Sequence, residues 1–410
     1  MKRMLYISHC LPYPPDKGDR VRAFHAIVAL SEHFEITLVA LARRKPDDSA
    51  VQELRAYCRE IIVAPVGGKL GLVRAAGSLL RGGSATEGFF ASSAIHGKVQ
   101  SAASAGPFDI AVGFSSSTLG YLLAAPAGAR VMDLVDVDSV KWASYADSAR
   151  WPVAALYRAE ARGVGRLERL AVASCDAVVL VSQAEIEAMP VGGDNLVAAG
   201  NGVDTDYYHP SPSPQPFPSP LSLVFTGQMD YRPNVEGVCW FVREVWPLLR
   251  RDYPELRFHV VGREPTPAVR RLAQAPGVVV TGAVPDVRPY LWAASAAVCP
   301  LKIARGIQNK VLEAMACGVA VVASPPAAEG ISDEGREHLH VAQSPQEWAK
   351  AVGLLLSDGQ RRLAAGSAGR RWVELRHTWS AQLAPMIALS RNLCRRGPAA
   401  AVDSPGLAGA

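Results

Sequence analysis

Short apolar runs of strand length alternate with segments of helical periodicity through the first half of this sequence. Such alternation is typical of a parallel sheet that is covered by helices on both faces. The expected strands are 4–8, 34–41, 61–64, 108–114, 130–135 and 177–181. Helices are expected at 51–57, at 151–173, and after Gly18, where Phe24, Ile27, Val28 and Leu30 recur at helical spacing.

The second half repeats the same alternation after a break in composition. The break is PSPSPQPFPSP at 210–220, which can form neither a helix nor an inner strand and therefore predicts a domain boundary. Beyond it the pattern predicts strands at 221–226, 257–261, 278–281, 296–299 and 319–323. It predicts helices at 234–249, 309–316, 348–356, 360–375 and 380–394.

The pattern therefore predicts an α/β protein of two doubly wound domains joined by a hinge. The expected domains are 1–205 and 221–375, with a linker at 206–220, a final helix at 376–396 and a small, polar, disordered tail at 397–410. A length of 410 residues suits two cores better than one. Ligands of such sheets bind beyond the carboxyl ends of the strands, so two facing domains favour an enzyme that holds two substrates in a cleft.

The net charge and the cysteine content restrict the partners and the cellular compartment to be expected. The net charge of +5 is compatible with a phosphorylated substrate or an anionic membrane surface, and it is too weak to indicate a nucleic-acid partner. The seven cysteines are scattered, with no C-x-x-C pair, which argues against zinc and favours a reducing cytoplasm. No signal peptide or bilayer-spanning run is evident, so we expect a cytoplasmic protein, with the inner face of the membrane as an alternative site.

The stretch PLKIARGIQNKVLEAMACGVAVVAS at 300–324 carries the clearest chemistry. It reads as a strand end, a loop, a helix at 309–316 closed by a C′ glycine at Gly318, and a second strand. A helix that begins after a parallel strand points free N–H groups and a positive dipole end at the sheet edge, where a phosphate can bind. Lys310 lies in the first turn, and Arg305 and Lys302 add charge. The alternative is an ordinary exposed face.

The helix in this stretch resembles the donor-sugar helix of GT4-type retaining glycosyltransferases, which have the GT-B architecture of two facing Rossmann-like domains. The matching motif is Glu-Ala-Met-Ala-x-Gly, at 313–318. Asn-Gly-Val-Asp at 201–204, followed by Tyr208 and Pro210, resembles the family's approach to the interdomain linker. YPPDKGDR, DLVDVDS, NGVD, MDYRPN and ARGIQNKVLEAMA are most similar to a bacterial branch associated with exopolysaccharide and PEP-CTERM gene sets.

The resemblance implies transfer of a sugar from a nucleotide-diphosphate sugar to an acceptor hydroxyl with retention, without a bound metal or cofactor. Lys310, the helix amides and Arg305 would stabilise the departing diphosphate, and Glu313 would bind the ribose. Many relatives have a glutamate where this chain has Arg305, which removes that glutamate's role at the sugar. The final helix would cross back onto the first domain. The implied donor-binding residues are Gly18, Gly227, Arg232, Arg263, Val284, Gly306, Ile307, Gln308, Asn309 and Glu313.

Two of these loop assignments have simpler alternatives. Arg232 is the available cation in GQMDYRPN, the loop where other branches bind the diphosphate, and Asn234 in the same loop also suits a helix N-cap. By resemblance the backbone around Val284 lies near the nucleotide base, and Asp286 serves equally well as a helix cap.

The first domain supplies the expected acceptor side. Of the three carboxylates in VMDLVDVDSVKW, Asp136 is the first candidate and Asp138 the second, while Ser139 also suits a helix cap. A magnesium site is the alternative for this cluster. His9, at a strand end, is either catalytic or structural, and Lys17 and Arg20 add charge beside Gly18.

Two further alternatives remain open at this level. The segment 69–83 is either a basic amphipathic helix on an anionic membrane or ordinary surface packing, because its glycines weaken the helix pattern. The acceptor would be a glycan or a lipid-linked molecule. A nucleotide-sugar epimerase or a non-catalytic binding protein of the same architecture is the alternative function, whereas a missing G-x-G-x-x-G argues against a dehydrogenase.

Overall fold

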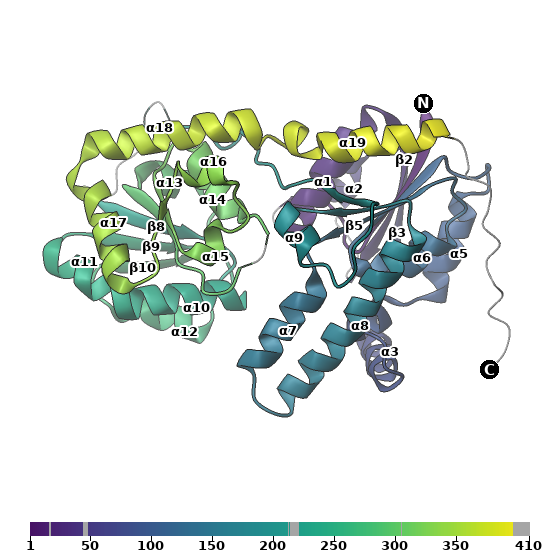
Figure 1. Cartoon of the computed structure of the whole chain (residues 1–410), viewed down its shortest axis with the longest axis horizontal. Helices are drawn as coiled ribbons and strands as arrows, with labels where there is room; N and C mark the ends of the chain where they lie inside the picture. Colours follow the sequence, from purple (N-terminus) through teal and green to yellow (C-terminus); the bar gives the residue numbers. More distant parts are fainter. Residues whose placement is uncertain (16–17, 44–47, 212, 214–220, 305, 397–410) are drawn as a thin grey trace. The chain divides into compact units, whose positions relative to one another are not determined.

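Two parallel sheets organise the chain (Figure 1). The computed structural model describes residues 1–15, 18–43, 48–211, 213, 221–304 and 306–396. The chain forms one unit from Met1–Ala199 and the residues from Leu383 onward, and a second unit from Gly200–Gln382. The predicted tail at 397–410 and most of the predicted linker lie outside the described residues.

The first sheet has seven strands in the order β3-β2-β1-β4-β5-β6-β7, and every neighbouring pair is parallel. Its strand order reverses between β1 and β4, which is the doubly wound arrangement that the alternation predicts. The strands are β1 (Lys2–Ser8), β2 (Phe34–Ala42), β3 (Glu60–Pro65), β4 (Ile110–Phe114), β5 (Arg130–Val135), β6 (Ala177–Leu180) and β7 (Leu196–Ala198).

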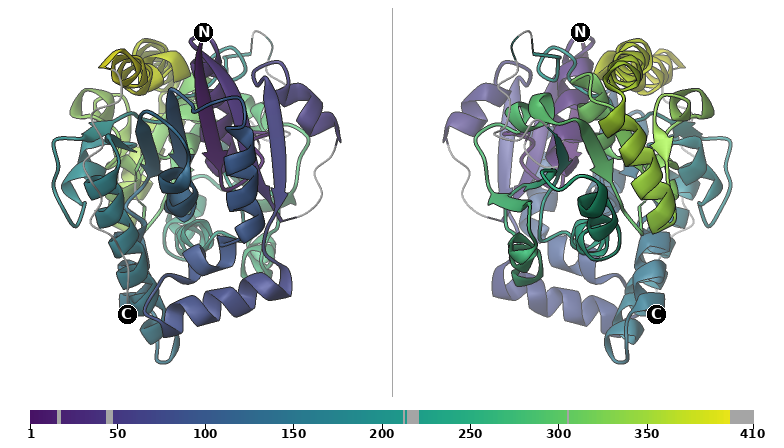
Figure 2. Two further views of the ribbon diagram at one scale, coloured as in Figure 1. Left: turned by 90° about the vertical axis from the view of Figure 1, so that its right-hand side faces the viewer. Right: turned by 90° about the vertical axis from the view of Figure 1, so that its left-hand side faces the viewer.

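Helices cover both faces of this sheet (Figures 1 and 2). Leu5 and Ile7 pack with residues of α5 and α6 on one face, and the alternation of a strand places Met4 and Tyr6 on the other. The helices are α1 (Gly18–Ser31), α2 (Asp48–Leu54), α3 (Gly68–Leu80), α4 (Ala85–Phe90), α5 (Ser93–Ala102), α6 (Leu119–Ala124), α7 (Asp138–Ser148), α8 (Val153–Ser174), α9 (Gln183–Glu187) and the part of α19 (Trp379–Arg396) that belongs to this unit.

The second sheet has six strands in the order β10-β9-β8-β11-β12-β13, again all parallel, with a reversal between β8 and β11. The strands are β8 (Ser222–Thr226), β9 (Arg257–Val261), β10 (Val278–Gly282), β11 (Ala296–Cys299), β12 (Val321–Ala323) and β13 (His340–Val341). The main helices are α10 (Arg232–Trp240), α11 (Trp246–Asp252), α12 (Pro267–Arg271), α13 (Arg288–Ala293), α14 (Asn309–Ala316), α15 (Pro325–Ala328), α16 (Asp333–Arg336), α17 (Pro345–Ser357) and α18 (Gly359–Arg376).

The predicted helix at 234–249 is not one α-helix. It begins earlier, at Arg232, and a π-helical segment (Phe241–Val245) separates α10 from α11. Pro247 supplies the reason, because a proline has no N–H to donate and its ring clashes with the carbonyl one turn earlier. The wider turn still buries Phe241 and Val245 in the core.

The first unit ends at Ala199, a few residues earlier in the chain than the predicted end of the first domain at 205. Residues after Gly200 hydrogen-bond within the second unit, where the Val203 N–H donates to the His377 carbonyl at 2.7 Å. The Arg370 guanidinium donates to the carbonyls of Thr205 and Tyr208. The segment around Asn-Gly-Val-Asp therefore folds with the second sheet.

The predicted end of α14 is confirmed. Gly318 has φ 72°, a left-handed conformation that favours glycine, and its N–H donates to the Met315 carbonyl at 2.9 Å. The following Val319 N–H donates to the Ala314 carbonyl at 3.0 Å. This turn sends the chain directly into β12 and fixes where α14 stops.

Within the described ranges, no helix combines the length and the apolar character that are needed to cross a bilayer.

A buried ion pair joins α1 to β5. Arg22 and Asp133 are 1% and 0% exposed, and two hydrogen bonds of 2.9 and 3.1 Å run from the guanidinium to the carboxylate. The sequence pattern gave no role to Arg22, although it shares the buried face of α1 with Ala26 and Ile27. The pair ties the first helix to the strand whose end carries Asp136.

We predict that Arg22→Met destabilises the protein by about 3–5 kcal/mol, because it leaves the Asp133 carboxylate buried without its cation. The matched control is Arg59→Met, whose ion pair with Glu35 is largely exposed and is expected to contribute about 1 kcal/mol or less. Urea denaturation of both full-length variants measures the difference. Equal losses would contradict the role of the buried pair.

Candidate functional site

The loops that follow β8 and β11 leave the second sheet at the point where its strand order reverses. In doubly wound sheets the chain leaves two neighbouring strands in opposite directions there, which opens a crevice beyond their carboxyl ends. The loop after β8 contains Gly227 and leads to α10, and the loop after β11 leads to α14. The predicted site residues of the second domain lie on these loops, on those after β9 and β10, and at the starts of α10 and α14.

The start of α14 is open to an anion. Its N-cap residue Gln308 makes no side-chain capping bond, and the backbone N–H groups of Asn309 and Lys310 donate to no described residue. Val311, Leu312 and Met315 are buried and hold the helix in place. The free N–H groups and the positive end of the helix dipole therefore lie at the edge of the sheet, where they favour a negatively charged ligand.

Lys310 lies beside a glycine that cannot be replaced without displacing it. A Cβ on Gly227 would lie 3.3 Å from Lys310 Cε and 2.8 Å from Asn234 Nδ2. A Cβ on Gly262, after β9, would lie 1.7 Å from the Gly227 carbonyl oxygen. The two glycines therefore allow the backbones after β8 and β9 to meet close to the lysine.

Asn234 lines the same corner, and its predicted role as an N-cap is wrong. It lies in the first turn of α10, whose N-cap is Tyr231, and its Nδ2 donates to the Gln228 carbonyl at 2.8 Å. Asn234 is only 3% exposed, and its Oδ1 has no hydrogen-bond partner in the described part of the chain. The Asn309 Oδ1 is likewise buried without a described partner. Such atoms are acceptors that a ligand hydroxyl or a water can satisfy.

Glu313 lies one turn into α14 and is partly buried. Burial raises its pKa to about 6, against the opposing effects of Lys310 and of a hydrogen bond from the Tyr208 hydroxyl. Sequence analysis assigned Tyr208 only to the motif before the linker, so the contact between Tyr208 and Glu313 was not predicted. It orients the carboxylate and leaves acceptor positions on its oxygens.

The remaining donor-binding candidates make contacts within the protein that do not by themselves indicate a ligand. Arg232 forms an ion pair with Glu236 at 2.7 Å, and Arg263 follows Gly262 with its carbonyl accepting from the Met229 N–H at 2.9 Å. Val284 packs against the core after β10. Gly306 and Ile307 are buried, and the backbone of Gly306 lies so close to Gly330 that a Cβ on Gly330 would be 2.3 Å from its carbonyl oxygen. Arg305 and Lys17 lie outside the described residues.

Asp286 is an ion-pair partner and lies one residue before Val287, the N-cap residue of α13, so its predicted role as the helix cap is wrong. Its carboxylate accepts from the Arg288 N–H at 2.9 Å, just at the start of α13, and pairs with the Arg288 guanidinium at 2.7 Å. The guanidinium also lies 3.9 Å from the centroid of the Tyr207 ring. This cluster holds the segment near Val284 in place.

In the first unit, charged side chains gather at the carboxyl end of β5. Burial raises the pKa of Asp136 to about 7; Lys141 and Arg22 oppose this shift, and Glu185 and Asp138 add to it. Asp138 pairs with Lys141 at 2.6 Å. Asp136 is therefore a carboxyl group that both gains and loses a proton near neutral pH.

The backbone beside Asp136 is strained. Val135 has φ 72° and Ser115 has φ 74°, a conformation that non-glycine residues, and β-branched ones above all, rarely adopt. The two positions are neighbours in space, because the Ser115 N–H donates to the Asp133 carbonyl at 2.8 Å. Such strain is maintained only where surrounding contacts fix the loop, and it is commonest at binding and catalytic loops.

The other predicted residues of the first unit have structural contacts of their own. The His9 ring stacks on Phe114 at a centroid distance of 5.4 Å and meets Phe90 edge-on at 6.1 Å. Gly18 begins α1 with open space around it, and Arg20 lies on the same helix. Ser139 lies inside α7 and donates its hydroxyl to Glu168, so its predicted role as a helix cap is wrong.

The alternative of a magnesium site at the three aspartates finds no geometric support. Asp133 is engaged by Arg22 and Asp138 by Lys141. Among the described residues, no group of three or more histidine, cysteine, aspartate or glutamate side chains is arranged to hold a metal ion.

Comparison with known proteins finds a family model that is similar to part of the second unit. Residues 220–358 match the family model of glycosyl transferases group 1. No curated protein matches the sequence.

Several solved structures share the fold over nearly the whole chain. Sucrose-phosphate synthase from Thermosynechococcus elongatus is similar with a TM-score of 0.71 and 17% identity, covering 97% of this chain and 100% of that one. HepE from Anabaena in complex with UDP-glucose is similar with a TM-score of 0.64 and 15% identity, covering 97% and 99%. WaaG, a glycosyltransferase involved in lipopolysaccharide biosynthesis, is similar with a TM-score of 0.65 and 15% identity, covering 95% and 99%.

These likenesses confirm the predicted fold class, the GT-B fold with two Rossmann-like domains. The family that residues 220–358 match and WaaG are both glycosyltransferases.

We predict that Glu313→Gln changes how stability depends on pH. The folded-state pKa of about 6 exceeds the ordinary value of 4.5, so burial stabilises the protonated form. That contribution is fully present below pH 4.5 and is lost as the pH rises through 6. The Gln variant should therefore gain about 2 kcal/mol relative to the wild type between pH 4.5 and 6.5.

Denaturation of both chains at several pH values measures this gain, with Glu337→Gln as the control because Glu337 is an exposed glutamate of the same unit. A stability difference for Glu313→Gln that does not vary with pH would contradict the burial argument.

Proposed function

We propose that this protein transfers a sugar from a nucleotide-diphosphate sugar to an acceptor hydroxyl, with retention of anomeric configuration and as a member of the GT4-type group. The uncapped start of α14 beside Lys310, at the reversal point of the second sheet, is the observation that carries the proposal. The UDP-glucose in the HepE structure, on a similar fold, adds support for a nucleotide-sugar donor.

The main barrier in this reaction is the separation of the anomeric carbon from a diphosphate leaving group. The charge that develops on that group meets the Lys310 ammonium and the N–H groups at the start of α14, and Arg305 adds a further cation. Fixed donors of this kind stabilise the transition state more than the ground state. The departing phosphate oxygen takes the acceptor's proton, so no carboxylate nucleophile is required.

Several side chains position the donor around this centre. Glu313, oriented by Tyr208, accepts hydrogen bonds from the ribose hydroxyls. Gly227, Gly306, Ile307, Gln308 and Asn309 present backbone groups to the diphosphate and the sugar, with Arg232 and Arg263 as additional cations. Val284 lies at the base, and Gly18 lets the first domain's backbone approach the donor.

The acceptor side belongs to the first unit. Asp136, with its pKa of about 7, accepts a hydrogen bond from the acceptor or from the transferred sugar. Asp138, Lys17 and Arg20 add polar contacts to the acceptor, and His9 is a catalytic residue on the acceptor side. The acceptor is a glycan or a lipid-linked molecule in the synthesis of an exopolysaccharide or another surface glycan, and the reaction takes place in the cytoplasm at the inner face of the membrane.

A basic, apolar helix supports the membrane part of this proposal. On α3 the side chains of Val73 and Leu80 are 68% and 89% exposed, and Leu70 and Leu72 are exposed beside them. The segment that sequence analysis left between a helix and surface packing is thus a helix, with Lys69, Arg74 and Arg81 along it or at its end. Exposed leucines and cations on one helix suit an anionic membrane surface.

We predict that Lys310→Ala weakens binding of the donor by about 10- to 100-fold, the loss expected for one charge-assisted hydrogen bond, and lowers turnover by about 10²- to 10³-fold. A thermal-shift panel of UDP-, GDP-, ADP- and dTDP-sugars first identifies the donor, because a ligand that binds the folded state raises Tm. The matched control is Lys350→Ala, an exposed lysine on α17 of the same unit, which should behave as the wild type.

Titration calorimetry and transfer of the labelled sugar measure the two losses. Normal turnover by Lys310→Ala would rule out its role. Release of an epimer would instead identify an epimerase, and binding without any reaction would identify a binding protein. The anomeric configuration of the product tests retention.

We predict that the wild type sediments with phosphatidylglycerol vesicles and that a variant with alanine at Lys69, Arg74 and Arg81 does so much less. The attraction should weaken as salt is raised, because it is electrostatic. Alanine at three exposed arginines on other elements, Arg55, Arg251 and Arg361, is the matched control. Equal recovery of the wild type and the α3 variant would contradict membrane contact by this helix.

A further inference from the structure

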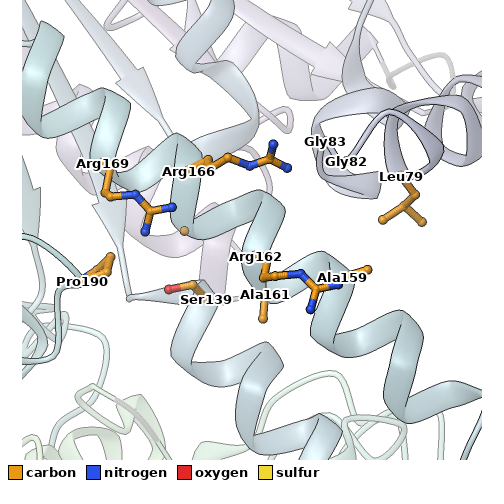
Figure 3. A pocket seen from close by; sticks show the side chains of 11 residues that line it. Leu79, Gly82, Gly83, Ser139, Ala159, Ala161, Arg162, Arg166, Arg169 and Pro190 are labelled. Carbon is orange, nitrogen blue, oxygen red and sulfur yellow. The ribbon is translucent and has the colours of Figure 1, made fainter.

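A surface pocket lies within the first unit, lined by none of the residues proposed to bind the donor (Figure 3). Its volume of about 640 Å³ falls in the range of small-molecule sites. It is open to solvent and is lined by the end of α3 and the following turn, by α8, by the start of α7 and by the segment after α9. Its lining includes Gly82, Ser139, Arg162, Arg166 and Arg169.

Three arginines of α8 line this cavity. Arg162, Arg166 and Arg169 are spaced four and three residues apart, which places them on one face of the helix. All three are exposed, and none of their guanidinium groups makes a hydrogen bond or an ion pair with a described residue. No aspartate or glutamate is among the described residues that line the cavity.

Both acidic residues of α8 already accept hydrogen bonds from other residues. Glu160 is buried and accepts hydrogen bonds from the Ser84 hydroxyl and from the N–H groups of Ala85 and Thr86. Glu168 accepts from the N–H and the hydroxyl of Ser139. Three like charges on one helix face repel each other, and Glu168 interacts only with Arg169 among them, so an anionic ligand would reduce the repulsion that remains.

The turn after α3 brings its backbone close to the Arg166 guanidinium. Gly82 has φ 77°, and a Cβ there would lie 3.7 Å from a terminal nitrogen of Arg166. A Cβ on Gly163 would lie 2.6 Å from the Gly83 carbonyl oxygen, so glycine on α8 allows this turn to pack against the helix. The turn therefore forms a wall of the cavity with the Arg166 guanidinium against it.

We propose that this cavity binds a phosphate or diphosphate group of the acceptor substrate, an inference that rests on the proposed glycosyl transfer. Guanidinium groups match phosphate oxygens in geometry and charge. The cavity also adjoins the proposed acceptor loop, because Ser139, in its wall, follows Asp136 by three residues. Leu79 in the wall and the exposed Leu80 next to it suit an apolar chain on the same molecule.

The test is calorimetric titration of the full-length chain with geranyl diphosphate, inorganic pyrophosphate and geraniol. We expect both diphosphates to bind and geraniol not to bind. Arg166→Gln should weaken binding of geranyl diphosphate about tenfold, and the triple change of Arg162, Arg166 and Arg169 to Gln should abolish it. Arg158→Gln, at another exposed arginine of α8 that does not line the cavity, should leave it unchanged.

Lys310→Ala and the triple variant, together with UDP as a second ligand, separate this site from the donor site. Lys310→Ala should leave binding of geranyl diphosphate unchanged, and the triple variant should bind UDP as the wild type does. Equal affinity of the wild type and the triple variant, or loss of binding in Lys310→Ala, would overturn the proposal. If the wild type binds geranyl diphosphate but no nucleotide, the cavity remains a phosphate site and the proposed donor site fails.

The ranking of the two diphosphates assigns the source of the group. Tighter binding of geranyl diphosphate indicates an acceptor with an apolar chain, and equal binding indicates a water-soluble phosphorylated acceptor. Both rankings support the phosphate site. The melting temperature of each variant confirms that the exposed substitutions leave the fold intact.

Discussion

The placement of one helix start at the edge of a sheet is the constraint on which this protein depends. The first N–H groups of α14 are useful to a ligand only if the helix is held firmly and its start is left uncapped. Buried apolar residues hold its body, and Gly318 ends it in a left-handed turn. The crossing of backbones at Gly227 and Gly262 holds the neighbouring loops at the same edge. Lys310 then adds a full charge to the partial charges of the amides.

The first unit uses different means to fix its own strand edge. A buried ion pair ties α1 to β5, and two residues have unfavourable backbone conformations, Ser115 directly after β4 and Val135 at the end of β5. The strain and the buried charges both reduce stability unless the packing around them is well defined. A carboxyl group with a pKa near 7 results at Asp136, which an unconstrained loop in water would not provide.

Much of this fold could be predicted from apolar periodicity, because parallel strands buried on both faces give nearly continuous apolar runs. The bounds of α14 and the turn at Gly318 follow from local signals that depend on few residues. The strand β7 was missed because its three residues are only partly buried, and α3 was discounted because of its glycines. The interruption at Phe241–Val245 follows from Pro247, whose effect the apolar period conceals.

The site was only partly predictable because its remaining contacts join distant parts of the chain. Arg22 meets Asp133 across 111 positions, and Tyr208 meets Glu313 from the segment before the second sheet. No local pattern connects such pairs. The three arginines of α8 have helical spacing in the sequence. Only the fold shows that the turn at Gly82 and Gly83 lines one pocket with them. Asn234 has the sequence features of a cap, and instead the helix begins before it.

The most direct test of the central claim is a crystal structure of this chain in complex with UDP. The account predicts that the diphosphate lies at the start of α14, with its oxygens about 3 Å from the Lys310 ammonium and from at least one of the N–H groups of Asn309 and Lys310. A diphosphate bound elsewhere on the chain, with the start of α14 in contact only with water or protein, would contradict it.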